Sequence, residues 1–161
     1  EGSGFKEFKG EVLINAPLEK VDAIIQDATG YTSWMSDCLE AAILEEKSPT
    51  HLIYYQATKA PWPVSNRDMV LDVTVTKTPD KIVRKMRHSV HAKKPVRSGY
   101  VRVPKLDGEW IELRKGEQTY VIYRVKMDMG GSLPASVANT TATKIPYETM
   151  LGLRRVATTG K

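Results

Sequence analysis

Gly130-Gly131-Ser132-Leu133-Pro134 is the stretch at which the chain changes from strands to a helix. Before it, residues 119–127 alternate between the two faces expected of a strand. After it, residues 134–156 predict one long helix with a cap near Ser132 or Leu133 and a proline in the first turn. Pro146 lies about midway and is expected to kink that helix. This stretch therefore marks the end of a sheet and the start of a C-terminal helix.

Working back from this stretch, the sequence predicts a run of strands joined by turns. The expected strands cover residues 39–46, 51–59, 69–76 and 82–90, and one interrupted at 104–108 covers 100–103 and 109–114. Ahead of them we expect a strand at 5–14, a helix from Pro17 to Gly30 and a helical turn at 31–35. Helices segregated from consecutive strands favour an α+β fold.

Small and polar side chains dominate the first half of the long helix. They are Ala135, Ala138, Asn139, Thr140, Thr141, Ala142 and Thr143. Such side chains cannot fill a thick core against the concave side of a curved sheet. The pattern therefore predicts either tight packing of helix on sheet or a space between them that holds a ligand.

Length and charge set broad limits on the protein. A chain of 161 residues, 41% of them hydrophobic, predicts a single domain over residues 1–161, and it has no apolar run long enough to span a bilayer. The lone Cys38 cannot form an internal disulfide, which leaves the compartment open. A net charge of +5 favours anionic surfaces such as phospholipid or nucleic acid without choosing between them. The opening Glu1-Gly2-Ser3-Gly4 predicts a trimmed or processed product.

Motifs of the common enzyme classes are missing from the sequence. It has no serine elbow, phosphate loop, dinucleotide fingerprint or paired His-Glu helix motif. His88 and His91 are three apart, and on a strand such residues face opposite sides, so they cannot chelate one metal ion. The aromatic and basic interleaving of RNA-binding sheets is also missing. We predict no enzymatic activity, no cofactor, no metal and no nucleic acid partner.

One eleven-residue segment, Ala60-Pro61-Trp62-Pro63-Val64-Ser65-Asn66-Arg67-Asp68-Met69-Val70, resembles the signature of START (steroidogenic-acute-regulatory-related lipid-transfer) domains. Residues 5–10, 99–103, 130–134 and 151–155 match in the same order, as do Asp27, Tyr31 and Trp34. The chain looks most like the short bacterial type. The resemblance implies a helix-grip fold, in which a curved antiparallel sheet wraps around the long C-terminal helix and encloses a lipid-sized cavity, with a short helix pair after the first strand.

The sequence departs from the START pattern in two respects. A helix and a strand usually precede the segment that corresponds to residues 5–10, and we expect them to be missing here, which would leave one sheet edge uncovered. Carriers of sterol and phospholipid often have an acid and an arginine in the cavity, but those positions are Tyr54 and Val73 here. The resemblance therefore does not identify the ligand. It favours a periplasmic location, because bacterial relatives of this shape often carry an export signal.

Ligand-binding residues can be proposed from strand faces and from the resemblance. They are Trp34, Tyr54, Arg67, Met69, Val73, Arg84, His88, Tyr123, Val137 and Thr141. Arg84 and His88 share a strand face with Ile82 and Met86, so they point inward if those apolar side chains do. Arg67 is expected either near the cavity floor or in a structural pair with Asp68 that ties the Trp62 loop to the sheet.

The loop that contains Lys93, Lys94, Pro95 and Arg97 has two interpretations. It is either a lid whose basic residues contact anionic membranes or an ordinary solvated loop. With the helix near Pro146, it is a candidate gate for ligand exchange.

The function expected from the resemblance is binding of a lipid or sterol, with transfer between membranes. Two alternatives remain open: a polyketide cyclase or aromatase that uses Arg84, His88 or Tyr123, and a basic surface-interaction protein with a filled core. The sequence leaves the oligomeric state open.

Overall fold

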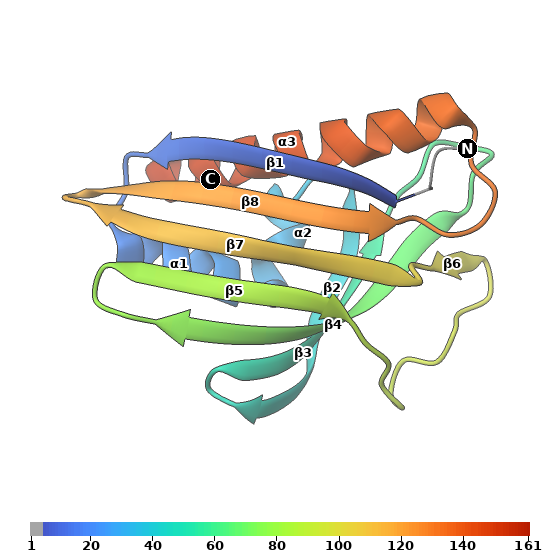
Figure 1. The fold of residues 1–161 in the computed structure, drawn as a ribbon, viewed down its shortest axis with the longest axis horizontal. Coiled ribbons are helices and arrows are strands. Elements are labelled where there is room, and N and C mark those ends of the chain that lie inside the picture. Colours follow the sequence, from blue (N-terminus) through green and yellow to red (C-terminus); the bar gives the residue numbers. More distant parts are fainter. Residues whose placement is uncertain (1–4) are drawn as a thin grey trace.

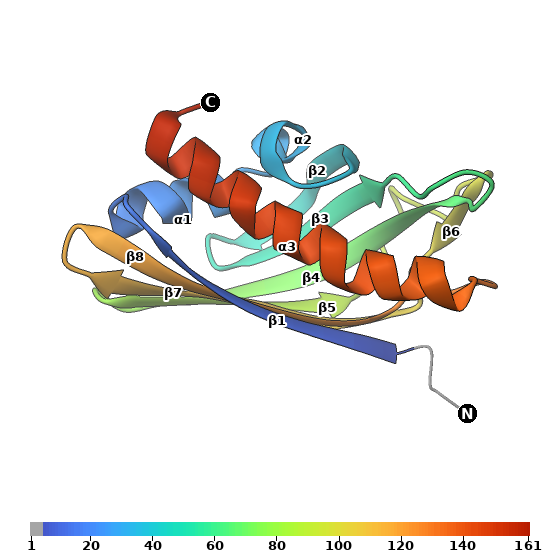
Figure 2. The same ribbon diagram turned by 90° about the horizontal axis from the view of Figure 1, so that it is seen from above.

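A curved sheet of eight strands wraps around the C-terminal helix in the computed structural model, which describes residues 5–161 (Figures 1 and 2). The strands are β1 (Phe5–Ile14), β2 (Cys38–Ser48), β3 (His51–Thr58), β4 (Asn66–Lys77), β5 (Lys81–His88), β6 (Tyr100–Arg102), β7 (Lys105–Lys115) and β8 (Gln118–Asp128). The helices are α1 (Leu18–Gln26), α2 (Tyr31–Trp34) and α3 (Ala135–Thr159), with a 3₁₀ turn at Ala28–Gly30. This arrangement confirms the predicted α+β helix-grip fold.

The strand order brings the first and last strands of the chain together. The order is β1-β8-β7-β5-β4-β3-β2, with antiparallel pairing throughout, and the short β6 pairs in parallel with β4 (Figure 1). Consecutive strands joined by tight turns pair in this way. Figure 2 shows α3 lying across one face of the sheet, with α1 and α2 on the same side. The sheet therefore has a covered concave face and a convex face turned away from the helices.

The region between residues 100 and 115 corrects one sequence prediction. We predicted one strand interrupted at 104–108, whereas β6 is separate and β7 runs without a break through Gly108. A Cβ atom at position 108 would lie 2.9 Å from the Arg124 carbonyl oxygen and 3.0 Å from the Met86 Cε. The glycine therefore allows close packing inside the strand, where the sequence pattern alone indicates a break.

The ends of two helices also differ from the prediction. The long helix extends past its predicted end at residue 156, because α3 continues to Thr159. Gly160 then ends the helix with a positive φ of 74°, and its N–H donates to the Val156 carbonyl. The first helix ends at Gln26 rather than Gly30, and the Asp27 side chain accepts from the Thr29 N–H at 3.0 Å to start the 3₁₀ turn.

Two apolar clusters lie on opposite faces of the sheet. The larger fills the space between the concave face and the helices. The smaller, Ile53, Tyr55, Ala57 and Val70, lies on the other face of β3 and β4. β3 is therefore buried on both sides, and its alternate positions separate cavity-facing from outward-facing residues. None of the described helices is long and apolar enough to cross a membrane.

Candidate functional site

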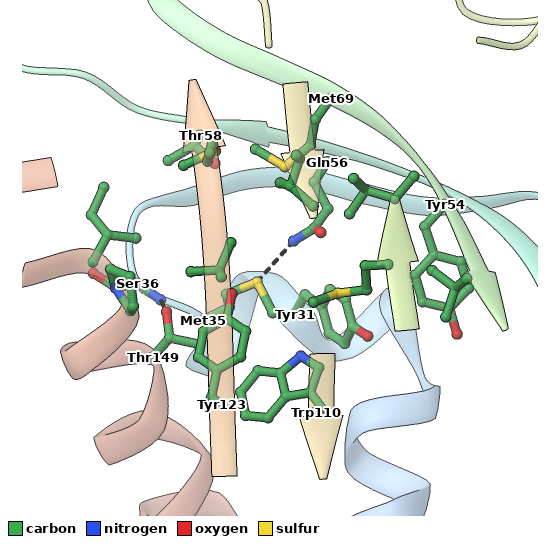
Figure 3. A pocket seen from close by; sticks show the side chains of 18 of the residues that line it. Tyr31, Met35, Ser36, Tyr54, Gln56, Thr58, Met69, Trp110, Tyr123 and Thr149 are labelled. Carbon is green, nitrogen blue, oxygen red and sulfur yellow. Dashed lines mark hydrogen bonds between the residues drawn. The ribbon is translucent and has the colours of Figure 1, made fainter. Parts of the chain in front are cut away.

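An internal cavity lies between the concave face of the sheet and α3, and its free volume is about 80 Å³ (Figure 3). Five of the six methionines line it: Met35, Met69, Met86, Met127 and Met129. β3, β4, β5, β7 and β8 contribute alternate residues, and α3 closes the space with Thr141, Ile145, Pro146 and Thr149. The walls are mainly apolar, as expected of a site that takes a hydrophobic molecule.

One wall of the cavity is an aromatic pair from neighbouring strands. Trp110 on β7 is directly opposite Tyr123 on β8, and their rings stack at 3.8 Å with an interplanar angle of 6°. Trp34 packs edge-on at 6.5 Å from Trp110 and at 5.3 Å from Tyr31. These contacts fix the Trp110 ring in one orientation against the cavity.

Two tyrosine hydroxyls in the cavity wall are already hydrogen-bonded to backbone carbonyls of α1. Tyr31 donates to the Ile25 carbonyl, and Tyr54 donates to the Gln26 carbonyl at 3.0 Å. Both bonds satisfy backbone acceptors near the end of the helix. Burial raises the pKa of Tyr31, Tyr54 and Tyr123, so all three hydroxyls keep their protons at neutral pH.

A buried charge cluster lies at the α1 end of the cavity. Arg84 on β5 is 1% exposed and contacts both Asp22 on α1 and Glu112 on β7. Lys77 adds a second cation, 2.7 Å from Asp22. Burial raises the pKa of Asp22, but the hydrogen bonds from Lys77 and Arg84 outweigh this and lower it overall. Arg84 therefore lines the cavity with its charge already opposed by two carboxyl groups.

Glu112 differs from Asp22 because it is fully buried. Burial raises the pKa of its carboxyl to about 7, although Arg84 favours the charged form. Its Oε1 atom has no hydrogen-bond partner within the described chain, and neither does the Arg84 Nε atom. The cluster is therefore incompletely satisfied and sensitive to protonation near neutral pH.

The second half of α3 is fastened to the segment after α2. The Ser36 N–H donates to the Thr149 hydroxyl at 3.2 Å, and the Ser36 hydroxyl donates to Glu148 at 2.9 Å. A Cβ atom at Gly152 would lie only 1.9 Å from the Trp34 carbonyl oxygen. The missing side chain thus allows α3 to touch α2.

A surface groove adjoins the cavity along the first half of α3. Thr141 and Ile145 line both spaces, so they separate the groove from the interior. The far wall of the groove is the loop that includes Lys59, Ala60 and Pro61. The groove and the cavity are therefore neighbouring spaces on the two sides of α3 residues.

The comparisons with known proteins agree with this architecture. A family model for the START domain matches residues 4–155. The chain belongs to the START domain family. An uncharacterised protein of Pseudomonas aeruginosa is 35% identical over 158 residues, which cover 98% of this chain and 78% of that protein.

Solved structures of two kinds resemble this START domain. A STAR-related lipid transfer protein from Xanthomonas axonopodis has a TM-score of 0.85 and 34% identity, covering 98% of this chain and 89% of that one. The Zhui aromatase/cyclase from a Streptomyces species has a TM-score of 0.66 and 14% identity, covering 96% and 94%. The second likeness shows the fold alone.

The START cavity brings together six of the ten residues proposed from the sequence as ligand-binding. They are Tyr54, Met69, Val73, Arg84, Tyr123 and Thr141. Trp34 lies behind the wall against Trp110, and Val137 lines the outer groove. His88 is half-buried at the end of β5, with its Nδ1 atom unpartnered among residues 5–161.

Arg67 holds the chain just before α3. It is 2% exposed and donates to the carbonyls of Ser65 at 2.6 Å, Gly130 at 2.7 Å and Met129 at 3.2 Å. Asp68 instead accepts from Arg102 and from the Tyr55 hydroxyl on the other face. These contacts support a structural role for Arg67, but the predicted pair with Asp68 is wrong, because adjacent residues of a strand point to opposite faces of the sheet.

The loop predicted as a lid, with Lys93, Lys94, Pro95 and Arg97, packs on the convex side of the sheet. Lys94 lies over the outward-facing Tyr55 ring, at 4.1 Å from its centre. Lys94 and Arg97 each contact Glu40 on β2 at 3.0 Å. The loop therefore does not lie over the cavity mouth as a lid would, because these contacts hold it on the face of the sheet opposite α3. Two of its three cations are paired with a carboxylate.

The cavity residues that were not proposed as ligand-binding from the sequence include Met35, Gln56 and Trp110. Gln56 lies two positions after Tyr54 on β3, and the two-residue period could have identified it. The side chain of Met35 could not be placed from its sequence, because it follows a short helix. Within residues 5–161, no three His, Cys, Asp or Glu side chains gather as a metal site.

Proposed function

We propose that this START domain binds a hydrophobic ligand in its cavity and transfers it between membranes without changing it chemically. The observation that supports this is the largely apolar cavity enclosed between α3 and the sheet. Burial of apolar ligand surface there contributes about 25 cal/mol per Å². The name of the Xanthomonas relative, a lipid transfer protein, points in the same direction.

Ligand uptake requires the cavity to expand. Its free volume of about 80 Å³ is well below the roughly 300–1,000 Å³ of typical ligand pockets. Methionine side chains have three rotatable bonds and adapt to irregular shapes. The five methionines in the wall can therefore rearrange around a ligand without a change of fold.

The first half of α3 is the part of this cavity-covering helix that is best suited to move. Its residues are small or polar and largely exposed, whereas Ser36, Glu148 and Gly152 fasten the second half. Pro146 lies between the halves and cannot donate the helical hydrogen bond to the Ala142 carbonyl. A movement that begins near Pro146 opens the wall between the cavity and the outer groove.

Membrane contact is best assigned to the loop at residues 59–65. Trp62 is 93% exposed in this loop, and its neighbour Pro61 lines the outer groove. An indole combines a large apolar ring with a polar N–H, which suits the interface between lipid and water. The basic loop on the convex face is less suited, because Glu40 already pairs with Lys94 and Arg97.

The binding step can be tested directly. Native mass spectrometry of freshly purified protein, followed by organic extraction, is expected to release a bound hydrophobic molecule. Delipidated protein is then expected to move dehydroergosterol, a fluorescent phosphatidylcholine or a fluorescent fatty acid from donor to acceptor vesicles. A protein that purifies empty and accelerates none of these transfers contradicts the proposal.

The membrane step needs a pair of variants that are matched in exposure. Trp62→Ala is expected to slow transfer while leaving binding in solution unchanged. Val96→Ala, in the other loop and also largely exposed, is the control and should have no effect. Slower transfer only after neutralisation of Lys93, Lys94 and Arg97 would instead assign contact to the convex face.

A second candidate function, a cyclase acting on polyketide chains, is favoured by the likeness to the Zhui aromatase/cyclase. Against it, Arg84 is already paired, and burial raises the pKa of Tyr123, which weakens it as an acid. Incubation with a poly-β-keto thioester tests this candidate: a product lighter by one water supports a cyclase.

A further inference from the structure

The cavity contains hydrogen-bonding groups that the protein itself leaves without good partners. The Gln56 side chain is 9% exposed, and its amide N–H donates only to the Met35 sulfur, at 2.8 Å. A thioether is a weak acceptor. No hydrogen bond to the Gln56 amide oxygen, the Tyr123 hydroxyl or the Trp110 indole N–H occurs among residues 5–161. All four residues line the same cavity.

These groups come from three strands and face the same cavity. In Figure 3 the Gln56 amide and the hydroxyl end of Tyr123 both point toward Met35, and Trp110 stacks on Tyr123. A ligand oxygen placed here would accept from Tyr123, Trp110 and Gln56, and a ligand hydroxyl could also donate to the Gln56 oxygen.

The cavity offers little to a charged group. Arg84 is the single charged residue among the described residues that line it. Two of its nitrogens contact Asp22 and Glu112, and the third, Nε, is fully buried and faces no partner. A carboxylate or phosphate brought into this space would lose its hydration without gaining a free cation.

We propose that the cavity selects a hydrophobic ligand whose polar group is an uncharged hydroxyl or carbonyl, held by Gln56, Tyr123 and Trp110. This inference rests on the proposed function and specifies its ligand class. The ligand oxygen replaces the Met35 sulfur as the partner of Gln56, and the flexible Met35 side chain moves aside.

Four probes of one chain length test the proposal: dodecanol, dodecane, dodecanoate and dodecyl phosphate. Each is titrated against delipidated protein loaded with Nile red, an uncharged dye, and displacement is followed by fluorescence. Dodecanol is expected to bind about tenfold more tightly than dodecane, as two hydrogen bonds would give. The two anionic probes are expected to bind less tightly than dodecanol.

Variants identify the residues responsible. Gln56→Met and Tyr123→Phe are each expected to weaken dodecanol binding about threefold, the effect of one of the two hydrogen bonds, while dodecane binding stays unchanged and reports that the cavity is intact. Tyr120→Phe changes the opposite face of the same strand, where the hydroxyl donates to Glu11, and is the matched control.

Two results overturn the inference while leaving ligand binding in place. One is tighter binding of dodecyl phosphate or dodecanoate than of dodecanol. The other is a ratio of dodecanol to dodecane affinity that neither variant changes. If neither Nile red nor any probe binds, the proposed function fails and this inference fails with it.

Discussion

Replacement of Glu112 by glutamine is expected to remove a pH dependence of stability that the buried cluster creates. Burial raises the pKa of this carboxyl from 4.5 to about 7, although Arg84 contacts it. The folded state therefore binds this proton more tightly than the unfolded state. The resulting stability is fully present below pH 4.5 and is lost as the pH rises through about 7.

The magnitude follows from the interval between the two pKa values. At about 1.4 kcal/mol per pKa unit, it corresponds to about 3 kcal/mol in all, most of it lost between about pH 5 and about pH 8. Asp22 acts in the opposite sense, since its pKa is lowered, and its contribution is lost only in more acidic solution. The neutral range therefore reports mainly on Glu112 within this cluster.

The assay is urea unfolding followed by circular dichroism at several pH values across that range, for delipidated wild-type protein and Glu112→Gln. The difference between the two proteins isolates Glu112, because other titrating groups contribute to both. Near pH 5 the two free energies of unfolding are expected to agree within about 1 kcal/mol, since the folded carboxyl is then protonated and resembles the amide. Near pH 8 the variant is expected to be more stable by about 2 kcal/mol or more. Parallel curves for the two proteins would refute the assignment of a raised pKa to this carboxyl.

Three further predictions concern α3 and its supports. Gly152→Ala is expected to lower the free energy of unfolding by about 2 kcal/mol, because the clash with the Trp34 carbonyl exceeds the roughly 1 kcal/mol by which alanine stabilises a helix relative to glycine. A variant that is as stable as the wild type, or more stable, in chemical denaturation contradicts this packing. Arg67→Gln is expected to cost at least about 3 kcal/mol in the same assay, since three carbonyls lose a charged donor; a loss below about 1 kcal/mol would mean that water replaces the guanidinium. Pro146→Ala is expected to slow Nile red uptake about fivefold in stopped-flow fluorescence, because a restored helical hydrogen bond makes the opening of α3 less favourable by about 1 kcal/mol. An unchanged uptake rate would mean that the ligand enters at another place.

Prediction from the sequence succeeded where local signals are strong. The alternation at 69–76 and 119–127 and the glycines before Pro134 identified strands and the start of α3 to within a few residues. It was less successful at Gly108 and Gly160, which have opposite roles: one continues a strand and the other ends a helix. A glycine permits both, and its surroundings decide between them.

The residues of the candidate site were also predicted only in part. The resemblance gave Tyr54 and Val73, and both line the cavity with Tyr123, because strand residues on one face share a two-residue period. Gln56 follows the same rule but gave no signal of burial, since a glutamine is usually exposed. Its importance comes from its weak partner, Met35, which a different part of the chain supplies.

The order of the elements, the START fold and the small residues on the helix that closes the cavity all follow from the amino-acid sequence alone. These depend on periodicity, turn residues and motifs, which act over short stretches of chain. Two features become visible only in the folded chain: the basic loop packs on the convex face, through Glu40 and Tyr55, and Arg84 is paired with Asp22 and Glu112. Those contacts join residues far apart in the chain, so no local pattern encodes them, and they determine which polar groups the cavity leaves free for a ligand.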